Sequence, residues 1–308
     1  MGRFPEKADF CYMNASVQQE GQESMQMVRL VECPRDAMQG WKHQIPTEQK
    51  IAYINKLLQV GFDTIDFGSF VSPKAIPQMA DTRAVLNGLS LKGSGSKLLA
   101  IVANERGADE AAAYPEIDFL GYPFSVSETF QQRNTNAGIN RSLSVVAGIQ
   151  DRCLQMNKQL VVYISMAFGN PYGDAWSEDI VYQWVDKLTG LDIRIISLAD
   201  TVGLATSEQI SAIAGYLVKS LPDIEIGVHL HARPGEWKEK VQAALQAGCQ
   251  RFDSALKGYG GCPMAGDDLV GNIDTEKLLP YFSALNILPE INQEALNESS
   301  ALASQIFI

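Results

Sequence analysis

The sequence predicts a closed barrel of eight parallel β-strands surrounded by α-helices, the (β/α)8 TIM barrel. Short apolar runs alternate with amphipathic stretches, and eight such runs are present along the 308 residues. The runs are apolar enough for a sheet that is buried on both faces, which is typical of parallel α/β folds. An open doubly wound sheet is the alternative. Its glycine-rich phosphate loop should follow an early strand, but the chain reads CPRDAMQG after the first one.

Each element is predicted from the spacing of its apolar residues. The strands are expected at residues 27–33, 62–67, 97–103, 117–122, 159–165, 192–200, 225–231 and 251–256. Helices are expected at residues 47–61, 138–157, 177–190, 207–221 and 236–249. In the first helix, Thr47 is the predicted N-cap and Gly61 the predicted C-cap. Residues 274–308 should add two C-terminal helices, so that residues 27–308 form a single domain behind an N-terminal extension of residues 1–26.

Composition excludes several classes of protein. With 46% hydrophobic and 20% charged residues, the chain is globular rather than disordered. The net charge of -11 argues against a nucleic-acid partner, although local basic residues can still bind a phosphate-bearing ligand. No apolar run approaches the ~18 residues of a membrane span. Five scattered cysteines without a CxxC pair predict free thiols and a cytoplasmic location.

The active-site groups of such barrels lie at the C-terminal ends of the strands. This rule selects polar residues that follow four of the predicted strands. They are Arg35, Asp36, Asp66, Asp200, Thr201, His229 and His231.

Two of the three histidines of the chain form the pattern VHLH at residues 228–231. Because alternate residues of a strand face the same side, both imidazoles should point into the barrel mouth. Such a pair suits a shared metal ion. The alternative is a pair of core histidines that are hydrogen-bonded to their neighbours. His43, the third histidine, lies in a polar loop and is expected at the surface.

Residues near the predicted metal site add oxygen and sulfur chemistry. Asp36 offers an oxygen ligand, and Arg35 offers a fork of donors for a carboxylate or a developing oxyanion. The alternative for this pair is a solvated surface ion pair. The glycine-rich stretch 258–272 favours close approach of backbone to a ligand. Within it, Cys262 could exchange protons and Asn272 could supply a carbonyl oxygen, unless they are an incidental cysteine and a turn asparagine.

Taken together, these segments resemble the 3-hydroxy-3-methylglutaryl-CoA (HMG-CoA) lyase family over roughly residues 27–300. This family belongs to the metal-dependent lyase and synthase barrels. The match at residues 69–81 is the most specific, since it is similar to a stretch particular to the HMG-CoA lyase branch. The matching segments are VECPRDAMQ (31–39), SFVSPKAIPQMAD (69–81), SLADTVGLAT (197–206), VHLH (228–231), GGCP (260–263) and GN (271–272).

The resemblance implies cleavage of HMG-CoA to acetyl-CoA and acetoacetate, with Mg²⁺ or Mn²⁺ as the cofactor, and we also expect a dimer or tetramer. Arg35 would steady the enolate oxygen, and Cys262 would act as general acid–base. Asp66 occupies the position of a family active-site glutamate. The implied metal ligands are Asp36, His229, His231 and Asn272. The implied substrate contacts are Gln39, Ser69, Asp200 and Thr201.

Three positions depart from the family pattern. Asp66 is one methylene shorter than the usual glutamate, and Ala232 replaces the aspartate of the usual HxHD run. The loop SMAFGNPYG, at residues 165–173, lacks the family's cysteines. Two other interpretations therefore stay open: a lyase, aldolase or synthase for a related acyl-CoA or 2-oxo acid, and a non-catalytic barrel that binds a metal and a ligand. Only about 35 residues follow Asp274, which favours a lyase or aldolase over a synthase with a regulatory region.

Overall fold

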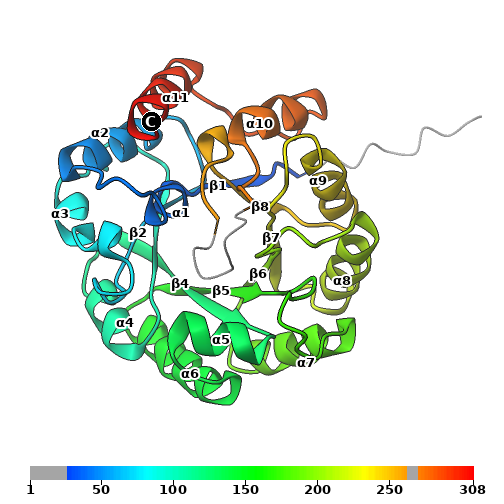
Figure 1. Ribbon diagram of the computed structural model, residues 1–308. Coiled ribbons are helices and arrows are strands. Elements are labelled where there is room, and N and C mark those ends of the chain that lie inside the picture. Colours follow the sequence, from blue (N-terminus) through cyan, green and yellow to red (C-terminus); the bar gives the residue numbers. More distant parts are fainter. Residues whose placement is uncertain (1–25, 262–269) are drawn as a thin grey trace, which may run out of the picture.

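The computed structural model describes residues 26–261 and 270–308, and its centre is a closed barrel (Figure 1). The eight strands follow one another around the barrel in chain order, all neighbours are parallel, and β8 closes against β1. The predicted (β/α)8 fold is thereby confirmed. The strands are β1 (Arg29–Glu32), β2 (Thr64–Ser69), β3 (Lys97–Ile101), β4 (Ile117–Ser125), β5 (Gln159–Ser165), β6 (Ile195–Ala199), β7 (Glu225–His229) and β8 (Arg251–Ser254).

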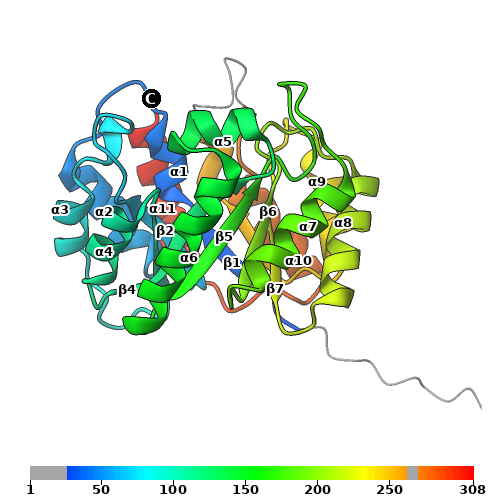
Figure 2. The ribbon, with the colours of Figure 1, turned by 90° about the horizontal axis from the view of Figure 1, so that it is seen from below.

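Helices form the outer ring of the barrel (Figures 1 and 2). The two predicted C-terminal helices are present, and the second of them packs against α2. The α-helices are α1 (Pro34–Gln39), α2 (Thr47–Leu57), α3 (Thr82–Asn87), α4 (Glu105–Ala112), α5 (Glu128–Thr135), α6 (Ile139–Gln155), α7 (Glu178–Thr189), α8 (Ser207–Ser220), α9 (Trp237–Gln246), α10 (Thr275–Ala284) and α11 (Gln293–Ile306). Short 3-10 turns lie at Pro77–Met79 and Leu256–Gly258.

Two apolar cores stabilise this arrangement. The larger core fills the space between the strands and the surrounding helices. The smaller one lies inside the barrel, where inward-facing side chains of β3 to β6 pack together; its members are Leu99, Ile101, Phe119, Val161, Tyr163 and Ile195. Burial of both faces explains why most strands read as continuous apolar runs. The strand ends therefore remain available for polar side chains.

The structure corrects several predicted boundaries. The N-cap of α2 is Pro46 rather than Thr47, which is the first residue of the helix and whose hydroxyl donates to the Asp81 carboxylate at 2.7 Å. The C-cap is Leu58. Gly61 lies beyond the helix end with φ at +105°, where a Cβ would stand 2.7 Å from the Glu290 carbonyl oxygen. The chain requires glycine there for a close backbone approach, not for capping.

Strand β7 ends at His229, two residues earlier than predicted. His231 instead forms an isolated antiparallel bridge with Asn272. The bridge brings the second histidine against the segment that precedes α10. Both histidines of the VHLH pattern are thus held by backbone hydrogen bonds, although only His229 belongs to the strand.

No helix within residues 26–261 and 270–308 is long and apolar enough to cross a bilayer. Cys33, Cys153 and Cys249 are buried free thiols.

Candidate active site

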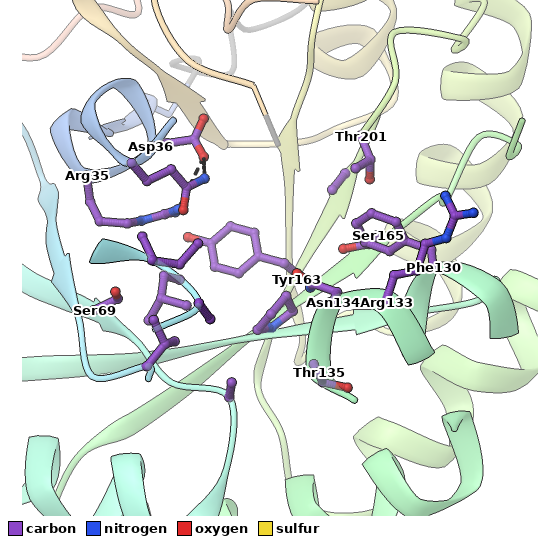
Figure 3. Close-up of a pocket in the computed structure, with 18 of the residues that line it drawn as sticks. Arg35, Asp36, Ser69, Phe130, Arg133, Asn134, Thr135, Tyr163, Ser165 and Thr201 are labelled. Carbon is purple, nitrogen blue, oxygen red and sulfur yellow. Dashed lines mark hydrogen bonds and ion pairs between the residues drawn. The ribbon is translucent and has the colours of Figure 1, made fainter. Parts of the chain in front are cut away.

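A cavity of about 380 Å³ opens at the C-terminal ends of the strands (Figure 3). Its walls come from the ends of β2 to β7, from α1 and from α5. Most lining residues fall into a polar group near the predicted metal site and an apolar or hydroxyl-bearing group, and α5 adds the cation of Arg133. The first is Arg35, Asp36, Gln39, His229 and His231; the second includes Ser69, Val71, Ile76, Ile101, Pro123, Phe130, Thr135, Tyr163, Ser165 and Thr201.

Arg35 and Asp36 stand side by side in the first turn of α1, which follows β1 directly. The Arg35 guanidinium donates to the Asp66 carboxylate through Nε, at 3.0 and 3.2 Å, and through Nη2 at 2.5 Å. Its Nη1 donates to Asp36 at 3.2 Å. A fork of donors held by two carboxylates fixes the orientation of the guanidinium. Arg35 is therefore a buried, oriented cation at the cavity wall, not a solvated surface group.

Asp36 is the hub of the polar contacts. It accepts hydrogen bonds from the Gln39 amide at 2.7 Å and from the Asn272 amide nitrogen at 2.6 Å. The Gly261 backbone N–H donates to it at 3.3 Å. The preceding residue, Gly260, has φ at +111°, and a Cβ there would lie 2.8 Å from Asp36 Oδ2. Glycine at this position therefore lets the backbone approach the carboxylate.

The two histidine rings meet at their Nε2 atoms, which are 3.2 Å apart. On the opposite side of its ring, His229 Nδ1 contacts Asp253 Oδ2 at 3.0 Å. When Nδ1 donates its proton to a carboxylate, the lone pair of the ring lies on Nε2, which is the arrangement found in carboxylate–histidine–metal triads. The Asp253 side chain is fully buried. It fixes the ring that faces Asp36 and His231.

The charges of these groups follow from burial and from their neighbours. Burial raises the pKa of Asp36, but Arg35 and the two histidines outweigh that effect and lower it to about 2. Burial and the adjacent His229 lower the pKa of His231 to about 3. Burial acts to lower the pKa of His229, but Asp253 raises it above the usual value. Asp36 is thus an anion and His231 a neutral ring at pH 7.

Asp36, His229 and His231 fit a divalent cation. One potential ligand atom from each of them lies within 4.8 Å of the other two. A carboxylate together with two imidazoles is a donor set that suits Mg²⁺ only partly and Mn²⁺ well. Cys33, His229 and Asp253 satisfy the same distance limit. Burial raises the pKa of the Cys33 thiol well above its usual range, which disfavours the thiolate that a metal needs.

The structure places only some of the predicted site residues at the wall of the cavity. Gln39, Ser69 and Thr201 line the cavity, while Asn272 lies behind Asp36 and presents its amide nitrogen to it. Asp200 does not line the cavity, because its carboxylate pairs with Lys240 at 2.7 Å. That Asp200 contacts substrate therefore stays a prediction, while its neighbour Thr201 lines the cavity. Cys262 lies outside the described residues. His43 is exposed, as predicted.

Asp66 also lies behind the cavity wall, where both of its oxygens contact Arg35. Burial raises its pKa to about 6, and the Arg35 guanidinium opposes that rise. The carboxylate is therefore ionised at neutral pH and serves as the anchor of Arg35.

Several lining residues were missed by the sequence interpretation. Ser165 ends β5 and satisfies the strand-end rule, so that rule could have found it. Phe130 and Thr135 come from α5, a helix that was not predicted. The hydroxyls of Tyr163 and Ser69 are buried without a hydrogen-bond partner in the described part of the chain. The Tyr163 hydroxyl is directed toward the side of the cavity that holds Arg35 (Figure 3).

The fold and the site define a class of protein: a (β/α)8 barrel whose strand ends carry a carboxylate–imidazole cluster suited to a divalent cation. A family model described as HMGL-like matches residues 28–302. The chain belongs to this HMGL-like family.

Individual relatives agree with the family match. The chain is 34% identical over 281 residues to the mitochondrial hydroxymethylglutaryl-CoA lyase of Mus musculus, covering 90% of this chain and 85% of that protein. It is 33% identical over 270 residues to the cytoplasmic 3-hydroxy-3-methylglutaryl-CoA lyase of Homo sapiens, covering 87% and 72%.

Solved structures are similar as well. An HMG-CoA lyase from Acinetobacter baumannii, in complex with coenzyme A and 3-methylmalate, has a TM-score of 0.83 at 32% identity, covering 90% of this chain and 92% of that one. The HMG-CoA lyase from Brucella melitensis has a TM-score of 0.85 at 28% identity, covering 92% and 99%.

Proposed function

We propose that this chain is a metal-dependent carbon–carbon lyase that cleaves HMG-CoA to acetyl-CoA and acetoacetate. The observation that carries the proposal is the cluster of Asp36, His229 and His231 beside the oriented Arg35 at the mouth of the barrel. The identity to HMG-CoA lyases over most of both chains supports the same reaction. The complex of a similar structure with coenzyme A supports an acyl-CoA substrate.

The residues present fit a cation, and we propose Mg²⁺ or Mn²⁺ held by Asp36, His229 and His231, with Asn272 as a further oxygen donor. For Asn272 to coordinate through oxygen, its amide must turn, because Nδ2 now faces Asp36 at 2.6 Å. When bound, the cation would chelate the hydroxyl and carboxylate of the substrate and act as a Lewis acid.

Arg35 has the next role in the proposed reaction. In the proposed reaction the C3 hydroxyl gives its proton to Cys262, acting as general base, and its oxygen becomes the ketone of acetoacetate as the C2–C3 bond breaks. The electron pair of that bond leaves negative charge on the thioester oxygen of the acetyl-CoA enolate, and a fixed guanidinium stabilises charge that develops there. Asp66 holds that guanidinium with two hydrogen-bonded oxygens. Cys262 would then deliver a proton to the enolate carbon, which completes acetyl-CoA.

Other parts of the proposal concern organisation. We propose that residues 27–308 act as one lyase domain, that the chain assembles as a dimer or tetramer, and that it works in the cytoplasm. The buried free thiols Cys33, Cys153 and Cys249 support a reducing compartment. Light scattering of the purified chain measures the assembly state directly.

A coupled assay that detects acetoacetate tests the substrate. With Mn²⁺ or Mg²⁺ present, HMG-CoA should be cleaved, and a chelator should stop the reaction. A small panel of other acyl-CoA and 2-oxo acid substrates tests the alternative of a related reaction. Faster turnover of a panel member than of HMG-CoA would replace the proposed substrate. Mn²⁺ binding without turnover of any of them would favour the non-catalytic barrel.

A further inference from the structure

Lys240, in α9, is a lysine whose ammonium is buried and fully hydrogen-bonded. The residue is 6% exposed. Its Nζ contacts the Asp200 carboxylate at 2.7 Å, the His231 carbonyl oxygen at 2.9 Å and the Gly203 carbonyl oxygen at 3.1 Å. An ammonium group has three N–H donors, and these three oxygens satisfy all of them. A buried charge with such complete pairing holds its partners in a defined geometry.

The three acceptors belong to two segments that follow neighbouring strands. Asp200 and Gly203 lie in the turn after β6, and His231 lies just past the end of β7. The backbone of Asp200 also donates to the His229 carbonyl oxygen at 3.0 Å. The turn after β6 is thus tied to the carbonyl groups of both histidines, to one directly and to the other through Lys240.

The two segments that Lys240 joins extend to the cavity and to Asn272. Thr201, next to Asp200, lines the cavity, and its hydroxyl accepts the Met166 backbone N–H at 3.0 Å. Beyond His231, the Ala232 N–H donates to the Gly271 carbonyl oxygen at 3.1 Å. Lys240 therefore stands at the junction between the substrate-facing turn and the segment that bears His231 and Asn272.

We propose that Lys240 is a positioning residue of the metal site. Its ammonium holds the main chain of His231 against the Asp200–Gly203 turn, and this fixes the second imidazole where its Nε2 lies 3.2 Å from that of His229. The inference rests on the proposed metal site, but it does not depend on which acyl-CoA is cleaved. Lys240 itself is not among the residues that line the cavity.

A simpler role would be neutralisation of the buried Asp200 carboxylate alone. The two roles differ in which contact matters. If charge pairing is the whole role, removing both charges together restores the site. If the donation to the His231 carbonyl matters, removing both charges restores stability but leaves His231 without its donor.

The experiment compares Mn²⁺ binding in the full chain and three variants. Electron paramagnetic resonance measures the free Mn²⁺ that remains in each sample. Lys240→Met keeps the apolar stem and removes every donor. The double variant Lys240→Met with Asp200→Asn also removes the opposing charge, while the asparagine oxygen can still accept the Ala205 N–H that now contacts Asp200 at 3.0 Å. Lys238→Met, an exposed neighbour in the same helix, is the matched control. Thermal unfolding of each metal-free protein is measured alongside.

We expect Lys240→Met to weaken Mn²⁺ binding about tenfold or more, as loss of groups that orient metal ligands commonly does. The double variant should unfold at a temperature near that of the wild type and still bind Mn²⁺ about tenfold more weakly. Lys238→Met should match the wild type in both measurements. If Lys240→Met does not fold, the Mn²⁺ affinity of the double variant alone tests the proposal.

Wild-type Mn²⁺ affinity in the double variant would overturn the proposal and leave Lys240 as a charge partner of Asp200. Absence of Mn²⁺ binding by the wild type would overturn both the metal site and this inference. Mn²⁺ binding that depends on Lys240, in a protein that does not cleave HMG-CoA, would support the inference and remove the proposed substrate instead.

Discussion

The cavity has two halves that differ in how their polar groups are paired. The charged half consists of Arg35, Asp36, His229 and His231, with Asp66 and Asp253 behind them. Each of these side chains contacts another member of the group at 3.2 Å or less. The neutral half consists of the uncharged residues Ile101, Pro123, Phe130, Tyr163 and Ser165, and the cation of Arg133, from the same helix as Phe130, lines the cavity next to them. Its walls are largely apolar, and the Tyr163 hydroxyl is without a partner in the described residues.

This difference separates two tasks. Groups that are already oriented need little reorganisation when negative charge develops, so the charged half is suited to stabilise a transition state. Apolar walls and a free hydroxyl are suited to recognise the shape and the polar edge of a bound molecule. Changes in the charged half should therefore lower kcat or abolish metal binding, whereas changes in the neutral half should mainly raise KM.

The largest effect is expected from removal of both imidazoles. His229→Ala combined with His231→Ala leaves Asp36 as the one remaining member of the carboxylate–imidazole cluster. We expect Mn²⁺ binding to be lost in calorimetry while the far-ultraviolet circular dichroism of the barrel is retained. An unchanged Mn²⁺ affinity in this double variant would contradict the assignment of the charged half as a metal site.

Arg35→Gln should have the next largest effect. The substitution removes a cation aimed at developing charge, so kcat should fall by about 10²–10³-fold and KM should change much less. Steady-state kinetics on HMG-CoA provide both values. Gln39→Ala, in the same helix, serves as a comparison that keeps the cation. A wild-type kcat for Arg35→Gln would remove Arg35 from the reaction.

Asp66→Asn tests whether the anchor behind Arg35 matters. The amide keeps the volume of the carboxylate but loses the charge that binds the guanidinium at 2.5 Å. A charge-assisted hydrogen bond contributes about 1.5 kcal/mol or more, so kcat should fall roughly tenfold. The expected fall is smaller than that for Arg35→Gln. An equal or larger fall would show that Asp66 has a direct role in the reaction.

Tyr163→Phe probes the neutral half and should have the smallest effect. Because the hydroxyl has no partner in the described part of the chain, its removal should leave the unfolding temperature unchanged or slightly higher. If the hydroxyl binds substrate, KM should rise about two- to tenfold with little change in kcat. A large fall in kcat at constant KM would place Tyr163 with the charged half.

The sequence predicted the charged half better than the neutral half, and the reason is physical. The strand-end rule locates a residue along a strand, and it selected Arg35, Asp36 and both histidines. It could not show that Asp200 turns toward Lys240, because that contact joins segments 40 residues apart. It could not show that Asp66 anchors Arg35 either, since side-chain direction depends on tertiary packing.

The missed elements have a related cause. Helices α1, α3, α4 and α5 were not predicted; each has six or eight residues, too few for a clear helical period, and α5 carries part of the neutral half. The alternation argument for VHLH placed both histidines in one strand. The strand ends at His229, and the bridge between His231 and Asn272 brings the second ring to the first.

The central claim is that Asp36, His229 and His231 hold one divalent cation. Electron spin-echo spectroscopy of bound Mn²⁺ counts the imidazole nitrogens that coordinate it. The account predicts nitrogen couplings from two histidines in the wild type and from one in His231→Ala. Bound Mn²⁺ without histidine nitrogen coupling in the wild type would contradict the claim and place the cation elsewhere in the molecule.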